Sequence, residues 1–196
     1  MNSINNRVEL KERIQSDLYR LEGNYKWKGK LKNLLISPSY KFITTHRKCQ
    51  YYRNKNKVAY LYCRFKLYRY NIKYGFEISN LAQIDTGFYI GHRGSIVINP
   101  NVKIGKNFSI TSGVTIGQEN RGKRQGSPSI GNKVWVGANA TIVGNITIGN
   151  NVLIAPGAFV NFDVPSNSIV VGNPATIREN IEATKGYIAW IVSEGE

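Results

Sequence analysis

The sequence predicts a mainly β protein: a left-handed parallel β-helix built from hexapeptide repeats, with an α-helical segment before it and a short helix after it. Between Ile78 and Val164 an aliphatic residue returns every six positions. An α-helix repeats every 3.6 residues and a strand every 2, so neither explains a sustained period of six. Hexapeptide repeats do, because each forms one wall of a triangular coil and stacked coils bury a continuous core. Gly and Asn recur at the following positions, where the corners of such a coil favour a positive φ.

Residues 1–74 are expected to form a basic, tyrosine-rich and mostly helical domain. Residues 1–75 hold 18 Lys and Arg against 4 Asp and Glu, and ten of the twelve tyrosines. Apolar residues at helical spacing predict a helix over 1–22 and more helix over 28–70, although 59–70 fits a helix or a strand. Basic residues among aromatics suit nucleic acid, an anionic membrane face, or an anionic glycan or cofactor. They equally suit a solvated helical surface over an aromatic core.

Residues 75–177 are expected to form the coil, which has only a small net charge. The clearest repeats begin at Ile84, Ile104, Ile110, Ile130, Val136, Ile142, Ile148 and Ile154. A polar, glycine-rich loop over 117–129 interrupts them, and loops of that length in a compact domain are often functional. The repeat ends after Val164, and residues 178–196 are expected to form a tail with a helix over 178–192.

The chain is expected to be cytoplasmic. It has no run of 18 apolar residues that would predict a transmembrane helix, and its first residues lack the apolar core of a signal peptide. Cys49 and Cys63 lack metal-ligand spacing, so reduced packing residues are expected there.

His92 is the candidate general base. It lies in the segment from Ile90 to Ile98, where the repeat lengthens from six residues to eight. Such an insertion can lift a side chain out of the wall, and a neutral imidazole has a pKa suited to accepting a hydroxyl proton. A carboxylate should orient the imidazole, and Glu77 and Asp85 are the candidates. His46 lies in the helical region, where a structural or surface role is expected.

Residues 75–175 resemble the hexapeptide acyltransferases of the serine acetyltransferase group. The resemblance runs through Gly75-Phe-Glu-Ile, Gly91-His-Arg-Gly-Ser-Ile-Val, Gly113-Val-Thr-Ile-Gly, Gly137-Ala-Asn-Ala and Gly172-Asn-Pro-Ala. In that group a histidine at position 92 deprotonates the acceptor hydroxyl, and an acidic residue at position 77 supports it. The resemblance therefore favours Glu77 over Asp85 as the partner of His92. It also implies that acetyl-CoA lies between neighbouring coils.

The residues expected to contact acetyl-CoA are small. The resemblance assigns the pantetheine arm to Gly137, Ala138, Ala155 and Pro156, and places Gly117 beside the thioester. The alternative for each glycine and alanine is that a coil needs small corner residues in any case. No metal is expected, because the zinc of γ-type carbonic anhydrases needs three histidines and the coil has one.

Departures from the serine enzymes concern the acceptor. Their Asp before the catalytic histidine is Gly91 here, and their Arg-His pair before a proline is replaced by Gly126 and Ser127. A zwitterionic amino acid needs paired charges, and a desolvated charge without its partner costs several kcal/mol. Gly91, Ser127 and Asp85 are therefore expected to border a neutral or larger acceptor. The site is more similar to that of colanic acid-type O-acetyltransferases of bacterial surface polysaccharides.

The sequence thus predicts an acetyl-CoA-dependent O-acetyltransferase whose acceptor is a surface-polysaccharide sugar or its precursor. A divergent serine O-acetyltransferase is the alternative enzyme, and a xenobiotic acetyltransferase is a third. The alternative outside enzymes is a trimeric scaffold that binds membrane or nucleic acid through residues 1–74, although nucleic acid is disfavoured. The resemblance implies a homotrimer or a dimer of trimers, and peripheral membrane contact is expected from residues 1–74.

Overall fold

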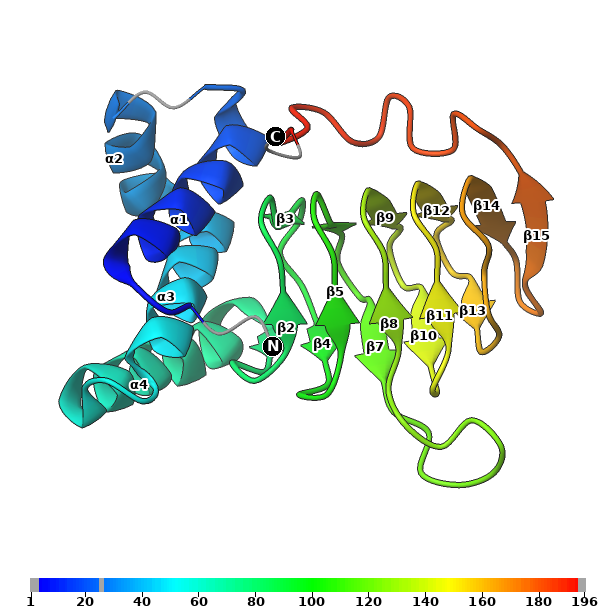
Figure 1. Cartoon of the computed structure of the whole chain (residues 1–196), viewed down its shortest axis with the longest axis horizontal. Helices are drawn as coiled ribbons and strands as arrows, with labels where there is room; N and C mark the ends of the chain where they lie inside the picture. The colour runs from blue at the N-terminus through cyan, green and yellow to red at the C-terminus, as the bar shows by residue number, and fades with distance from the viewer. Residues whose placement is uncertain (1–3, 25–26, 194–196) are drawn as a thin grey trace.

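The computed structural model describes residues 4–24 and 27–193. Four helices gather at one end of the molecule, and a coil of short strands extends away from them (Figure 1). The helices are α1 (Arg7–Glu22), α2 (Trp27–Ile36), α3 (Pro38–Tyr52) and α4 (Lys57–Tyr74). The strands are β1 (Phe76–Ile78), β2 (Gln83–Ile84), β3 (Tyr89–Ile90), β4 (Ile96–Ile98), β5 (Lys103–Ile104), β6 (Ser109–Ile110), β7 (Thr115–Gly117), β8 (Ser129–Ile130), β9 (Val134–Val136), β10 (Thr141–Val143), β11 (Thr147–Ile148), β12 (Val152–Ile154), β13 (Phe159–Val160), β14 (Ser168–Val171) and β15 (Thr176–Glu179).

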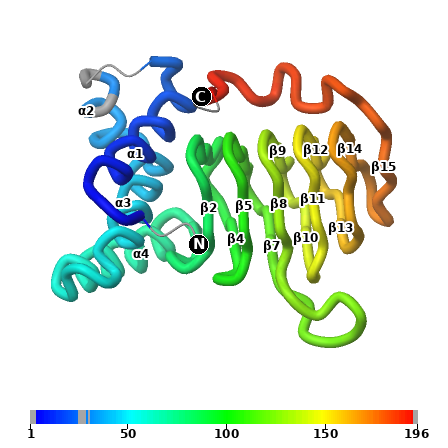
Figure 2. The backbone as a smooth tube through the Cα atoms, viewed as in Figure 1, coloured from blue at the N-terminus to red at the C-terminus, as the bar shows by residue number. Residues whose placement is uncertain are grey.

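The strands form the three walls of a left-handed parallel β-helix, which confirms the predicted fold class. The first wall is β1-β4-β7-β10-β13, the second is β2-β5-β8-β11, and the third is β3-β6-β9-β12-β14. The tube in Figure 2 shows successive coils stacked side by side along one axis. Register places Ile78, Ile98, Ile116, Ile142 and Val160 in one buried row of the first wall. The six-residue period therefore corresponds to one aliphatic residue per wall.

The helical segment covers the first coil. α4 ends at Gly75, whose φ of 73° is left-handed, and Phe76 then starts β1 as a buried residue. Residues 59–70, which fit either a helix or a strand by sequence, are helical. Asn56 caps α4 by accepting a hydrogen bond from the Ala59 N–H at 2.9 Å, and Cys63 buries its side chain against the core.

A buried ion pair ties the helices to the coil. The guanidinium of Arg47 in α3 donates to the carboxylate of Asp17 in α1 at 2.9 Å, and both side chains are fully buried. Arg47 also donates to the backbone oxygens of Ile84 and Asp85, while Asp17 accepts from the Phe88 N–H at 2.8 Å. All of these polar groups are thereby satisfied inside the protein.

The expected C-terminal helix over 178–192 is wrong. β15 pairs antiparallel with β14, and the chain then runs back along the coil through turns toward α1 (Figure 1). The coil supplies partners that a helix would forgo: Asn107 exchanges two hydrogen bonds with the backbone of Val192, and the ring of Tyr187 lies 4.7 Å from that of Trp135. Ile188 is buried, whereas Ile181, Trp190 and Ile191 are exposed, so the apolar residues of this segment form no single buried helical face.

No helix in the described ranges is both long enough and apolar enough to cross a membrane.

Candidate active site

His92 lies at the corner between the third and first walls. In later coils three residues turn this corner, as in Thr111–Gly113 and Ala155–Gly157, whereas Gly91–Ser95 makes the same turn with five. The inserted residues form a bulge that carries the exposed imidazole of His92. Gly94 closes the bulge with a φ of 144°, and a Cβ there would lie 2.9 Å from the Cβ of Ser112. The lengthened repeat thus presents His92 outside the wall, as expected.

Glu77 lies on the first coil, beside the same corner. The bulge meets the end of α4 through a 3.3 Å hydrogen bond from the Gly94 N–H to the Tyr74 oxygen. Glu77 follows three residues after Tyr74 and is exposed, because Phe76 and Ile78 on either side point into the core. Its register partner on β4 is Val97. The structure therefore places Glu77 on the first coil and His92 at the corner where the chain passes from the first coil to the second.

A groove of about 460 Å³ runs from Glu77 across the first wall to α4. Its polar lining is mostly neutral, with Glu77 and Arg64 as the charged groups. The other polar side chains that line it are those of Tyr68, Asn71, Ser79, Asn80 and Asn99, and Gly117 also borders it. The hexapeptide period could not predict that Arg64, Tyr68 and Asn71 of α4 line this groove. Their position depends on the angle at which α4 meets β1 at Gly75.

The long loop lies at the opposite edge of the first wall, where β7 ends at Gly117. It folds back as a hairpin in which Glu119 and Gly126 exchange two backbone hydrogen bonds of 2.9 Å. Ser127 donates its hydroxyl to the side-chain oxygen of Asn99 at 3.1 Å, which brings Ser127 to the end of the groove. Residues 95–99 separate the two edges by roughly 13 Å of extended chain. Within one chain, His92 and the loop therefore flank the wall from opposite sides.

Asp85 lies elsewhere, at the corner between the second and third walls. Its carboxylate accepts from the Thr86 N–H at 2.7 Å and lies 3.7 Å from the guanidinium of Arg13. A carboxylate held in this way anchors α1 to the coil. The structure does not place Asp85 beside His92, so Asp85 forms no part of the candidate site.

The remaining candidates from the helical segment are packing residues. His46 is buried and contacts the Ser79 oxygen through Nε2 at 3.0 Å, and burial lowers its pKa to about 4. Cys49 and Cys63 are buried and unpaired, and burial raises the pKa of the Cys49 thiol to about 12. A thiol with so high a pKa is a poor nucleophile near neutral pH.

The small residues assigned to acetyl-CoA stack at the same corner as His92. A Cβ on Gly137 would lie 2.5 Å from the nitrogen of Pro156, so the stacking of coils alone explains that glycine. Ala138 and Ala155 are partly exposed and Pro156 is exposed, which leaves an open, shallow edge along the corner. This edge can accept a narrow chain that runs along the coil axis.

Comparison with known proteins identifies the family. Residues 127–161 match the model of the bacterial transferase hexapeptide, six repeats. The chain is 42% identical over 135 residues to WcaB of Escherichia coli K12, named as a putative colanic acid biosynthesis acetyltransferase, covering 66% of this chain and 82% of that protein. Serine acetyltransferase 2 of Arabidopsis thaliana is 39% identical over 109 residues, which are 56% of this chain and 34% of the plant enzyme. The chain thus spans only about a third of that relative.

A solved structure agrees with these relatives. The serine acetyltransferase of Brucella abortus in complex with coenzyme A superposes with a TM-score of 0.70 at 26% identity, covering 87% of this chain and 66% of that one. The match to WcaB extends beyond the repeats, since 135 aligned residues exceed the length of the coil. The chain belongs to the hexapeptide-repeat acyltransferases.

Proposed function

We propose that this protein transfers an acetyl group from acetyl-CoA to a hydroxyl of a bacterial surface-polysaccharide sugar or its precursor. The groove beside Glu77 carries this proposal. Its lining combines amide side chains with the ring of Tyr68, and such groups suit a polyhydroxylated acceptor through hydrogen bonds and stacking. The likeness to a colanic acid biosynthesis acetyltransferase supports the same class of acceptor.

His92 acts as the general base. Its neutral imidazole takes the proton of the acceptor hydroxyl as the oxygen attacks the acetyl carbonyl carbon of the thioester. The carbon–sulfur bond then breaks, and the imidazolium returns the proton to the sulfur, which gives the acetyl ester and free coenzyme A. Glu77 orients the imidazole and stabilises its charged form. Neither cysteine lies in the coil, so the transfer proceeds directly, without a covalent enzyme intermediate.

Acetyl-CoA lies along the corner formed by Ala138, Ala155 and Pro156, with Gly137 shaping the backbone there. The exposure of these residues supports the fit, because bulky side chains would fill the edge. Gly117 and the loop flank the thioester from a neighbouring subunit. The arrangement needs a neighbouring subunit, because His92 and the loop lie at opposite edges of the first wall in one chain, and a homotrimer would supply it. Sedimentation of the active species as a trimer tests it, and an active monomer would contradict it.

Serine O-acetylation remains the second candidate. Arg64 favours it, because its guanidinium lines the groove and can pair with an amino acid carboxylate. Against it, Gly91 offers no carboxylate for the amine of serine. Glu77 is proposed to orient His92, so its carboxylate is not available to bind the amine of serine instead.

The proposed location is the cytoplasm, with peripheral contact to the membrane through residues 1–74. A lipid-linked sugar precursor would then be presented at the same surface. The charge of 18 basic against 4 acidic residues in 1–75 supports this contact.

The deciding experiment measures free thiol released from acetyl-CoA with L-serine, simple sugars and a polysaccharide extract offered in parallel. Release should require a carbohydrate. His92→Ala should lower turnover by roughly 10²–10⁴-fold, the usual contribution of a general base. Arg93→Ala, which changes the neighbouring exposed residue of the same bulge, is the matched control and should retain turnover. Full turnover of His92→Ala would refute the mechanism, and release with L-serine alone would refute the acceptor.

A further inference from the structure

α4 carries an apolar face that nothing covers in the described part of the chain. Its members recur at intervals of three and four residues, which places them on one side of the helix. They are Val58, Leu61, Tyr62, Phe65, Tyr68 and Ile72, and each is 56–79% exposed. The opposite side of α4 is the one that packs on the core, through Cys63 and Leu67. We call these six residues the apolar stripe.

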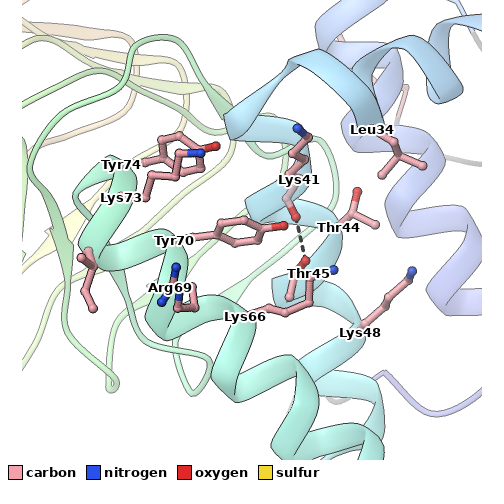
Figure 3. A pocket seen from close by; sticks show the side chains of 11 residues that line it. Leu34, Lys41, Thr44, Thr45, Lys48, Lys66, Arg69, Tyr70, Lys73 and Tyr74 are labelled. Carbon is pink, nitrogen blue, oxygen red and sulfur yellow. Dashed lines mark hydrogen bonds between the residues drawn. The ribbon is translucent and has the colours of Figure 1, made fainter.

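A basic pocket opens next to the apolar stripe. It lies between α3 and α4 and encloses about 730 Å³ (Figure 3). Lys41 and Lys48 enter it from α3, and Lys66, Arg69 and Lys73 enter it from α4, whereas no carboxylate of the described residues lines it. None of these five cations forms an ion pair within residues 4–24 and 27–193. The pocket therefore concentrates positive charge that no acidic side chain of the described chain offsets.

The pocket and the stripe are continuous. Ile72 belongs to the stripe and also lines the pocket, beside Arg69 and Lys73. At the other border, Tyr68 belongs to the stripe and lines the groove that holds Glu77. A single face of α4 thus joins a cation-lined pocket, an exposed apolar strip and the candidate acceptor groove.

We propose that this face of α4 docks on an anionic phospholipid surface, with a lipid phosphate in the basic pocket and the apolar stripe in the interfacial layer. A helix with an apolar side bordered by Lys and Arg has the composition of interfacial membrane helices. Anionic lipids attract the cations, and the apolar side chains leave water. This docking deepens, and rests on, the membrane contact in the proposed function: an acceptor carried by a lipid would reach the groove beside Tyr68.

Two other occupants fit the observations less well. A second copy that packed this same face against its own would bring Lys66, Arg69 and Lys73 toward the same cations of its partner, and like charges repel at close range. A nucleic acid would satisfy the cations but leave Leu61, Phe65 and Ile72 facing water. A bilayer surface offers negative charge and an apolar layer together.

The test is co-sedimentation of the full chain with vesicles of phosphatidylcholine alone or mixed with phosphatidylglycerol. Binding should require the anionic lipid. Lys66→Glu combined with Arg69→Glu should weaken it by about tenfold or more, since each cation near an anionic surface contributes severalfold. Phe65→Ser should weaken binding without changing net charge. Lys103→Glu combined with Arg178→Glu, two exposed sites on the coil with the same charge change, is the control and should bind within about twofold of the parent.

Several outcomes would overturn the docking. Binding to neutral vesicles that is as tight as binding to anionic vesicles would be one, and an equal loss of binding in the control variant would be another. The third is a protein that binds inorganic diphosphate but does not bind vesicles. A Phe65→Ser chain that breaks an assembly of the protein in the absence of vesicles would assign the stripe to a second copy. Acetyl transfer to a soluble acceptor is measured in the same variants, and its retention with loss of vesicle binding separates docking from the proposed chemistry.

Discussion

The coil and the helical segment are stabilised in different ways. The coil repeats one aliphatic position on each wall, so its core is a stack of similar contacts such as Ile98, Ile116 and Ile142. The helical segment depends on contacts that occur once, above all the buried pair of Arg47 and Asp17. Repetition spreads stability over many equivalent residues, whereas a single network concentrates it. Substitutions should therefore have their largest effect where the contacts are unique.

Arg47→Ala should destabilise the protein more than any change in the coil. It leaves the carboxylate of Asp17 buried without its partner, and removing one member of a buried pair costs about 3–5 kcal/mol. Chemical denaturation followed by helical circular dichroism measures this loss. The Asp17→Ala and Arg47→Ala double variant should recover part of it, because no uncompensated charge remains. A loss below about 1 kcal/mol would contradict the view that the helical segment concentrates its stability in this pair.

His46 should make the helical segment sensitive to acid. Burial lowers its pKa to about 4 from 6.5, so the unfolded chain binds a proton more readily than the folded one. The stability that His46 contributes is thus complete above pH 6.5 and is lost as pH falls from 6.5 toward 4. Between pH 7 and pH 5 the loss should be about 2 kcal/mol.

Unfolding at both pH values measures the effect against the His46→Gln variant, whose side chain does not titrate. The difference between parent and variant should shrink at low pH. An identical pH dependence in the two proteins would show that this histidine is not protonated on unfolding.

Two glycines of the coil should differ in how well they tolerate a side chain. Gly137→Ala forces a Cβ to within 2.5 Å of Pro156, and overpacking of this kind costs about 1–3 kcal/mol. Gly117→Ala meets its nearest atom, Cγ1 of Val143, at an ordinary 3.5 Å and should be neutral or slightly stabilising. Thermal unfolding of the two variants compares them. Equal melting temperatures would mean that neighbouring coils shift to accommodate a side chain at the Gly137 corner. The spacing of the coils would then vary more than the regular repeat suggests.

The same contrast explains what the sequence could predict. A hexapeptide repeat is a local rule, so the coil, its long loop and the bulge at His92 follow from spacing alone. Spacing left Glu77 and Asp85 open as partners of His92, and only the family resemblance favoured Glu77. Asn99 and Tyr68 could not be selected, because their presence in the groove depends on strand register and on the angle of α4. Asp85 shows the reverse case, since nothing local reveals that Arg13 holds its carboxylate.

The helix predicted near the C-terminus was wrong for a related reason. Residues 178–192 have apolar positions near helical spacing, but their partners lie on coils far away in the sequence. Hydrogen bonds such as that of Thr184 to Asn151, at 2.7 Å, fix the segment against the coil. Local periodicity cannot anticipate partners of this kind, and tertiary contacts decided the outcome.

Gly91→Asp should have the smallest effect on stability and sharpens the comparison at the site itself. A Cβ at Gly91 would meet Tyr89 and Thr111 at 3.5 and 3.6 Å, which are ordinary contacts, so the free energy of unfolding should change by less than about 0.5 kcal/mol. Gly126 differs, because its φ of 133° would strain any other residue, and a Cβ there would lie 3.0 Å from the Cβ of Asn145.

The carboxylate of the serine enzymes can therefore be restored before His92, whereas their arginine cannot simply be restored in the loop. If the acceptor is a sugar, Gly91→Asp should leave thiol release with L-serine at background, because an amine partner alone does not complete a zwitterion site. A gain of L-serine activity in this single variant would show that Arg64 already binds the carboxylate. The groove would then be a serine site lacking one group rather than one built for a glycan.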